Sequence, residues 1–356
     1  MPSTRDTTYE KIRVIAMILT VAGHCLGSME TRTVSEQYLY DGLKPVIYTC
    51  NGLFFMLSGK FALATKCESF NDYYRYYTKK ILTLVIPILF YMFLRSIYDN
   101  GLGFLQLSFW KTYIKNVLFD YSGTEYWFLY TIMGLLFLAP FLNKMVSRLR
   151  KEEIYLFLTF GLLYNSFVTY GPYFNLSFSW NYIFGSWVFY FFLGYFLEKI
   201  IDTPKKENLI ILIGILSLVI TFIQEQGSYV KNIHDLAPTY TFMVCAMFFL
   251  LKKGHHTKNH PSLDMFIIKC GRYSFAVYMV HNPVRDFLVE TIHLPIDGNY
   301  LLSLFMLTAC TLIISFIIAF ICENTFVRAL KWCACKIMNR VYCAPSQPII
   351  PLPPRN

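Results

Sequence analysis

Hydrophobic residues in this chain form long runs that recur about every 25 to 30 residues, without any long polar interval. A helix needs about 20 mostly apolar residues to cross a bilayer. Ten stretches approach this length: 12–28, 44–65, 81–98, 126–143, 154–170, 181–198, 208–224, 238–251, 264–282 and 300–322. We therefore predict an all-α, polytopic membrane protein with about ten transmembrane helices. Residues 1–328 form its transmembrane domain, and residues 329–356 form a cytoplasmic, partly disordered tail with a Pro-rich end.

Composition agrees with this interpretation. Of the 356 residues, 55% are hydrophobic and 15% are charged, whereas soluble proteins carry about 25% charged residues. The chain has too few polar groups to cover a surface exposed to water, which excludes an ordinary soluble enzyme. Its ten cysteines lie mostly within or beside the apolar runs and lack paired spacing, so we interpret them as small apolar fillers.

The net charge of +10 is distributed unevenly along the chain. One set of alternating connections holds 22 Lys and Arg residues and the other set holds six. Basic residues concentrate in the cytoplasmic connections of membrane proteins, so we expect both termini in the cytoplasm. The basic balance is thus a topology signal, and we expect no nucleic acid partner. A cleaved signal peptide is an alternative for the first run, but no A-x-A site follows it.

The first predicted helix carries two ionisable residues on one face. Arg13 and His24 are eleven residues apart, which in a helix is three turns plus about 20° and a rise of about 16 Å. Ionisable residues at membrane depth are costly and are therefore candidates for function. The structural alternative is that Arg13 anchors the inner end of the helix and His24 is a polar residue at the interface.

The second predicted helix places Asn51, Phe55 and Ser58 on one face, next to Gly59. No Gly-x-Ser-x-Gly turn surrounds Ser58, and a nucleophile needs an adjacent base. We therefore assign Ser58 a positioning role. A buried serine often only bonds to a carbonyl one turn back, which is the structural alternative.

Four segments occur in an order that resembles the acyltransferase 3 family: "YEKIRVIAMILTVAGH", "GLFFMLSGKFAL", "YWFLYTIMGLLFLAPFL" and "RYSFAVYMVHNPV". The resemblance covers about residues 8–326. Members are integral-membrane acyltransferases, typically of ten helices, that O-acylate bacterial cell-surface polysaccharides and related glycans. Lys60 departs from the family, which usually has an aromatic or apolar residue after Ser-Gly.

The resemblance implies that His24 is the catalytic histidine and that Arg13 belongs to the donor site. It also implies acetyl-CoA or another acyl-CoA as the donor substrate, and a bacterial plasma membrane location. Donor phosphates need cationic partners, which we expect to be Arg13, Lys79 and Lys80, with Ser58 beside them. A histidine near neutral pKa can remove the proton of a sugar hydroxyl. With the donor and the glycan acceptor that the resemblance implies, we expect O-acetylation of a glycan or its lipid-linked precursor.

On the acceptor side we place Asn51, His281, Tyr126 and Trp127. Aromatic faces suit sugars, although Trp and Tyr also anchor helices at the interface. His281 has Ser274 and Tyr278 on its face and is either an acceptor residue or a polar cap. We expect no metal site and no tightly bound cofactor, because His255, His256 and His260 lack acidic or thiol partners at useful spacing.

Two other functions remain open. A polysaccharide exporter or flippase of this size would also have ten helices and a polar cleft. Transporters often contain internal repeats, and no second copy of the segment from Arg13 to Ser58 occurs, which favours the enzyme. Acylation of a lipid or a protein is the third possibility.

Overall fold

A computed structural model describes residues 6–101, 103–118, 126–176, 184–227, 236–253, 261–292 and 299–341. Every regular element in these ranges is helical, which confirms the all-α prediction. The α-helices are α1 (Thr7–Gly27), α2 (Val34–Ile47), α3 (Thr49–Ala62), α4 (Phe70–Lys80), α5 (Ile86–Asn100), α6 (Leu107–Leu118), α7 (Trp127–Val146), α8 (Lys151–Tyr170), α9 (Ser186–Ile200), α10 (Pro204–Gln226), α11 (Pro238–Lys253), α12 (Pro261–Asp286), α13 (Tyr300–Asn324) and α14 (Phe326–Val341).

Each of the ten predicted stretches overlaps a helix, but the boundaries differ in instructive ways. Residues 181–183 of the stretch 181–198 lie outside the described residues, and α9 begins at Ser186. The stretch 44–65 is divided at Tyr48, where α2 ends and α3 begins. Helices α4, α6 and α14 were not predicted because they are amphipathic and lack a continuous apolar run. The last of them lies in the predicted tail, and residues 342–356 are outside the described residues.

Five helical segments are long and apolar enough to cross a membrane, by length and composition: Phe70–Asn100, Trp127–Val146, Lys151–Phe174, Pro204–Gln226 and Tyr300–Met338. A polytopic membrane protein follows from these segments. The count of ten spans stays a prediction, because α3, α9 and α11 have 14, 15 and 16 residues, which is short for a spanning helix.

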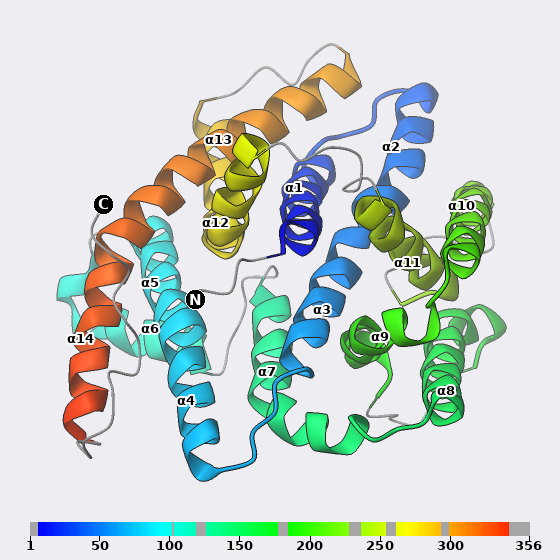
Figure 1. Ribbon diagram of the computed structural model, residues 1–356. Helices are drawn as coiled ribbons and strands as arrows, with labels where there is room; N and C mark the ends of the chain where they lie inside the picture. The colour runs from blue at the N-terminus through cyan, green and yellow to red at the C-terminus, as the bar shows by residue number, and fades with distance from the viewer. Residues whose placement is uncertain are drawn as a thin grey trace.

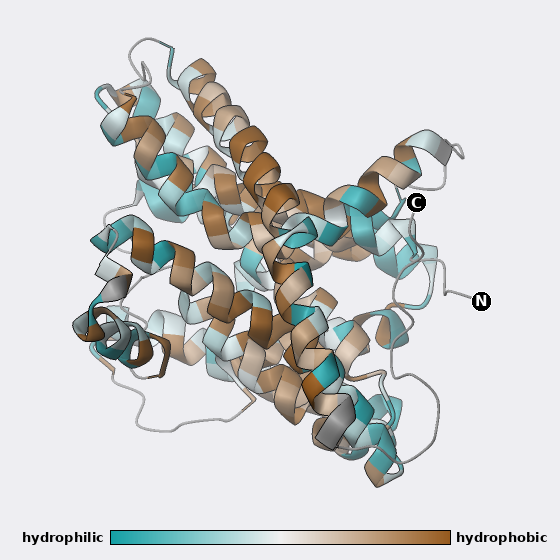
Figure 2. Ribbon diagram, turned by 90° about the vertical axis from the view of Figure 1, so that its left-hand side faces the viewer, coloured by the Kyte–Doolittle hydropathy of each residue, from teal (hydrophilic) through white to brown (hydrophobic). Residues whose placement is uncertain are grey.

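Helix α10 shows how the surface suits lipid. Its large apolar side chains, such as Leu212, Ile215 and Ile223, are about half exposed or more, whereas its buried face consists of small or slim residues, Gly214, Ser217 and Thr221. Membrane helices pack closely through small residues. Hydrophobic residues run along most helices in Figure 2, as expected for a bundle that is solvated by acyl chains.

Helix α1 lies at the centre of the bundle (Figure 1). It packs against α12, α3 and α13, and also contacts α2 and α11. Its N-terminus is capped by Asp6, whose side chain accepts a hydrogen bond from the amide of Thr8 at 2.9 Å. The helix runs without interruption from Thr7 to Gly27, so Arg13 and His24 lie on one rigid element, as predicted.

Two glycines allow α3 and α9 to cross in direct backbone contact. A Cβ atom added at Gly59 would lie 1.7 Å from the carbonyl oxygen of Phe191, and one added at Gly194 would lie 1.9 Å from that of Met56. These obstacles are backbone atoms, which cannot rotate away. The crossing fixes the position of α3, the helix that carries Ser58.

Substituting Gly194→Ala is therefore expected to destabilise the protein, because α9 must move away from α3. Overpacking typically costs about 1–3 kcal/mol, which a thermal melt of the purified protein in detergent would register as a lower midpoint. Gly134→Ala on α7 is the matched control, since its added Cβ meets nothing within 4 Å. Equal midpoints for the two variants would contradict the described crossing.

Candidate active site

A pocket of about 460 Å³ lies where α1, α3, α4 and α7 meet. Its lining includes Arg13, Ser58, Lys79 and Lys80. These are the four residues predicted for the donor site, and the structure brings all of them together. They come from three helices, α1, α3 and α4, within the first 80 residues.

The pocket is strongly cationic. Lys66 and Arg75 line it together with Arg13, Lys79 and Lys80. Its one described carboxylate, Asp72, already accepts hydrogen bonds from the backbone and hydroxyl of Ser69 as part of the cap of α4. Arg13 in addition pairs with Glu10 at 2.7 Å. Five cationic side chains against two carboxylates that are both already engaged make a site for a molecule with several negative charges.

Lys66 and Arg75 were not singled out from the sequence. Arg75 and Lys79 are four residues apart, so they lie on one face of α4. The useful signal was the amphipathic pattern of 70–80, which a search for continuous apolar runs passes over. Tyr77 holds this helix against α7, because its hydroxyl donates to the carbonyl of Phe137 at 2.9 Å.

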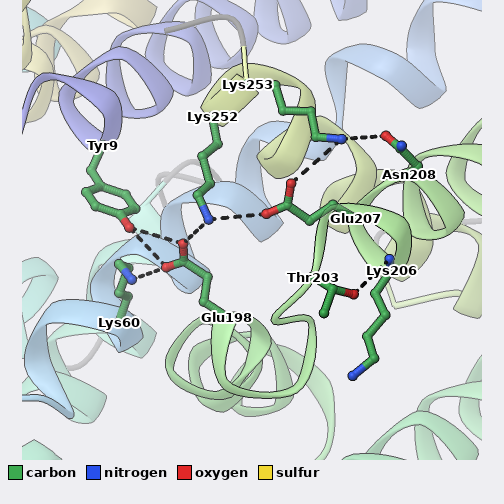
Figure 3. Close-up of polar contacts among 9 residues, drawn as sticks. All are labelled: Tyr9, Lys60, Glu198, Thr203, Lys206, Glu207, Asn208, Lys252 and Lys253. Carbon is green, nitrogen blue, oxygen red and sulfur yellow. Dashed lines mark hydrogen bonds and ion pairs between the residues drawn. The ribbon is translucent and has the colours of Figure 1, made fainter. Parts of the chain in front are cut away.

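An ion network lies beside the pocket and joins five helices (Figure 3). Glu198 of α9 pairs with Lys60 of α3 and with Lys252 of α11, the second at 2.7 Å. Tyr9 of α1 donates to the same carboxylate at 3.0 Å, and Glu207 of α10 lies 3.4 Å from Lys252. The network gives the charged Lys60, which departs from the family pattern, a partner within the protein.

This network also supports one wall of the pocket. The ring of Tyr9 contacts Phe61 edge to face, with the centroids 5.5 Å apart, and Phe61 lines the pocket. Glu198 therefore helps to hold α1 and α3 at the distance that the pocket requires.

We expect Glu198→Gln to lower stability, because it removes the carboxylate that two partly buried ammonium groups share and leaves Lys252 with Glu207 alone. Loss of such charge-assisted bonds costs about 1–3 kcal/mol, measured as a lower thermal midpoint in detergent. Asp202→Asn is the control. Hydrogen bonds from Lys151 and Lys206 lower the pKa of Asp202, but these pairs are exposed and screened, so the midpoint should stay close to wild type. A larger drop in the thermal midpoint for Asp202→Asn than for Glu198→Gln would contradict this prediction.

His24 lies three turns beyond Arg13 and faces the second predicted histidine. Its ring centroid is 4.9 Å from that of His281 on α12, and the ring planes are inclined by 56°. His24 is half-buried, whereas His281 is fully buried. Two histidines that are 257 positions apart in the sequence thus share one site.

Arg285 fixes the relation between these two helices. Its Nη1 donates to the carbonyl oxygen of His24 at 3.1 Å, and its Nε donates to Asp286 at 2.9 Å. Arg285 thus places a cation beside the last turn of α1, which is also favourable toward the dipole of that helix. In the sequence, Arg285 stood out only as a basic residue of a short connection.

A row of aromatic rings leads from the histidine pair to Trp127 of α7, one of the predicted acceptor residues. Consecutive centroids are 4.9–5.6 Å apart. The rings in order are His24, His281, Tyr278, Phe128, Phe55, Trp187 and Trp127. Trp127 therefore belongs to a continuous row of rings that ends at His24, and Trp187, which was not singled out from the sequence, lies beside it.

Two other predicted acceptor residues are not members of this row of rings. Tyr126 is buried, with 4% of its surface exposed, and packs in the apolar core near α12 and α13. Asn51 lies one turn before Phe55 on α3 and is half-buried. The described lining of the cationic pocket does not include His24, so the two parts of the site are connected by α1 itself.

Among the residues that the structure describes, no three or more His, Cys, Asp and Glu side chains gather in a way that could hold a metal ion. His255, His256 and His260, for which no metal site was expected, lie outside the described residues.

Comparison with known proteins identifies the class. The family model of the acyltransferase 3 family, described as an acyltransferase domain, matches residues 9–321. The chain belongs to this family, which confirms the resemblance found in the sequence.

Curated relatives are also found. The probable poly-beta-1,6-N-acetyl-D-glucosamine export protein of Staphylococcus aureus (strain MSSA476) is 27% identical over 235 residues, which cover 60% of this chain and 63% of the relative. The protein with the same description from Staphylococcus epidermidis is 29% identical over 177 residues, covering 45% of this chain and 48% of the relative. The chain thus spans less than two thirds of these relatives. No solved structure matches significantly.

Proposed function

We propose that this protein is a membrane O-acyltransferase, with acetyl as the simplest acyl group. It transfers the group from acyl-CoA to a hydroxyl of a cell-surface polysaccharide or its lipid-linked precursor, in the plasma membrane of a bacterium. The observation that carries the proposal is the pocket shared by Arg13, Ser58, Lys79 and Lys80. One of these residues, Arg13, lies on α1, the helix that also carries His24.

Charge and length support the donor assignment. Acyl-CoA carries phosphates at one end and a thioester at the end of a long, thin arm. The phosphates bind in the cationic pocket, which we place on the cytoplasmic side. The arm then extends along α1 toward His24, over a rise of about 16 Å.

His24 acts as the general base. It removes the proton of the acceptor hydroxyl while the oxygen attacks the thioester carbonyl. The half-buried rings of Trp127 and Trp187 provide faces on which a sugar can lie, and the fully buried ring of Phe55 packs against both of them. Because the row of rings ends at the histidine pair, a sugar on these faces would bring a hydroxyl toward the basic nitrogen.

A second candidate is glycan export without acyl transfer. It is favoured by one observation, the description of the staphylococcal relatives as probable export proteins. A cationic pocket at one end of the bundle is not required for that function, whereas it is required for a phosphorylated donor.

Cells that express the wild-type gene, an empty vector or His24→Asn would separate the two functions. Mass spectrometry would measure the O-acyl ester content of the surface glycan, and a lectin would measure its amount. The enzyme predicts ester groups only with the wild type. Glycan that reaches the surface in equal, unesterified form with wild type and His24→Asn, but not with the vector, would support export and contradict the enzyme.

A further inference from the structure

The tautomer of His281 follows from its contact with the backbone. Its Nδ1 lies 2.6 Å from the carbonyl oxygen of Tyr278. A carbonyl oxygen can only accept, so Nδ1 must carry the proton of this hydrogen bond. In a neutral imidazole the other nitrogen is then an acceptor, so Nε2 of His281 presents a lone pair.

That lone pair is buried without a partner. His281 has no exposed surface, and Nε2 makes no hydrogen bond in the described part of the chain. Buried polar atoms are nearly always paired, so an unpaired acceptor in a packed core indicates a group that bonds there at another stage of the reaction cycle.

His24 is the neighbour that fits this acceptor. An N–H···N bond of about 2.9 Å between two imidazoles separates their ring centroids by about 5 Å, and the observed separation is 4.9 Å. The inclination of 56° rules out parallel stacking. Arg285 donates instead to Asp286 and to the carbonyl of His24. Catalytic hydrogen bonds are often loose before substrate binds, so a small rotation of His24 is sufficient.

We propose that His281 is a positioning residue that accepts a hydrogen bond from a ring N–H of His24 when the substrates are bound. This rests on the proposed acyl transfer. The bond holds the proton of neutral His24 on the side of His281 and turns the basic nitrogen toward the acceptor hydroxyl. It is the role that a carboxylate has in a Ser-His-Asp triad, performed here by a neutral imidazole.

The proton balance is complete. The hydroxyl O–H bond breaks and the proton moves to His24, while the oxygen forms a bond to the acyl carbon. The C–S bond then breaks, and the imidazolium of His24 returns the proton to the thiolate sulfur, which gives the free thiol of CoA. Throughout, Nε2 of His281 accepts from His24 and is never protonated itself.

Two substitutions test this role. His281→Phe keeps a ring but removes the acceptor, whereas His281→Gln keeps an oxygen near the position of Nε2. We expect His281→Phe to lower kcat about 10²-fold or more, with the KM for acyl-CoA within about twofold, and His281→Gln to recover at least about tenfold of that loss. Glu290→Gln, at an exposed position nine residues further along the chain, is the control and should match wild type.

A folded His281→Phe variant with wild-type kcat would overturn the proposal. So would equal losses in the Phe and Gln variants, or a raised KM for the acceptor with kcat unchanged, which would make His281 a binding residue.

The tautomer can be measured on the wild-type protein without any variant. Solid-state NMR with ¹⁵N-histidine and carbonyl-¹³C tyrosine identifies His281 by the proximity of its Nδ1 to the Tyr278 carbonyl. We expect a protonated Nδ1 and a bare Nε2, and a protonated Nε2 would overturn the proposal. The NMR result does not depend on activity. A wrong tautomer of His281 would overturn only the positioning role, whereas failure of the proposed function would appear as absence of acyl transfer by the wild type.

Discussion

His24→Asn is expected to reduce acyl transfer from acyl-CoA to the glycan by about 10²–10⁴-fold, because a general base contributes about this much to a rate. Asparagine is smaller than histidine and cannot take up a proton. The rate would be measured with purified protein in proteoliposomes, at donor concentrations well above KM, so that only the catalytic step is compared.

The donor pocket lies at the other end of α1 and should be unaffected. Binding of acyl-CoA to His24→Asn, measured by isothermal titration, is therefore expected to equal wild type. Glu30→Gln, at an exposed position three residues after α1, controls for a change near the end of the helix. A His24→Asn protein that binds donor and transfers at the wild-type rate would remove His24 from the mechanism.

Removing a positive charge from the pocket is expected to weaken donor binding, whereas His24→Asn is expected to slow the catalytic step. Arg13→Gln should raise the KM for acetyl-CoA by about 10–100-fold, because a charge-assisted hydrogen bond contributes about 1.5–3 kcal/mol. The same change should have little effect with S-acetyl-pantetheine, a donor that lacks the nucleotide phosphates. Initial rates with the two donors would be compared.

Arg13 also pairs with Glu10 at 2.7 Å, so Lys79→Gln combined with Lys80→Gln provides a second test that leaves this pair intact. Arg148→Gln, which is exposed and does not line the pocket, is the control. Equal increases in KM for acetyl-CoA and S-acetyl-pantetheine would show that these cations do not bind the phosphates.

The sequence predicted those features of the fold and site that depend on a single helix. The spacing of Arg13 and His24 is a property of α1 alone, and the apolar runs mark helices, both α10, which faces lipid, and α1, which lies at the centre of the bundle. The position of α4, which lines the pocket together with α1 and α3, depends on tertiary packing. Lys79 and Lys80 were nevertheless placed in the donor site, because we expected basic residues at the inner end to bind the phosphates.

The missed residues share a physical reason. Lys66, Arg75 and Trp187 lie on segments that are short, amphipathic or uniformly aromatic, so periodicity does not distinguish them. The contact of His24 with His281 joins positions that are 257 residues apart. Hydrophobicity predicts that both α1 and α12 are helices, but the orientation of α12 against α1 comes from packing and from the bond of Arg285 to the carbonyl of His24.

The most direct measurement uses the purified protein in proteoliposomes with [¹⁴C]acetyl-CoA and the surface glycan of the host cell. After digestion and removal of the donor, the account predicts radioactivity in the glycan that mild alkali releases as acetate, as an ester requires. A glycan that remains unlabelled, while the protein binds acetyl-CoA and moves the glycan across the bilayer, would contradict it.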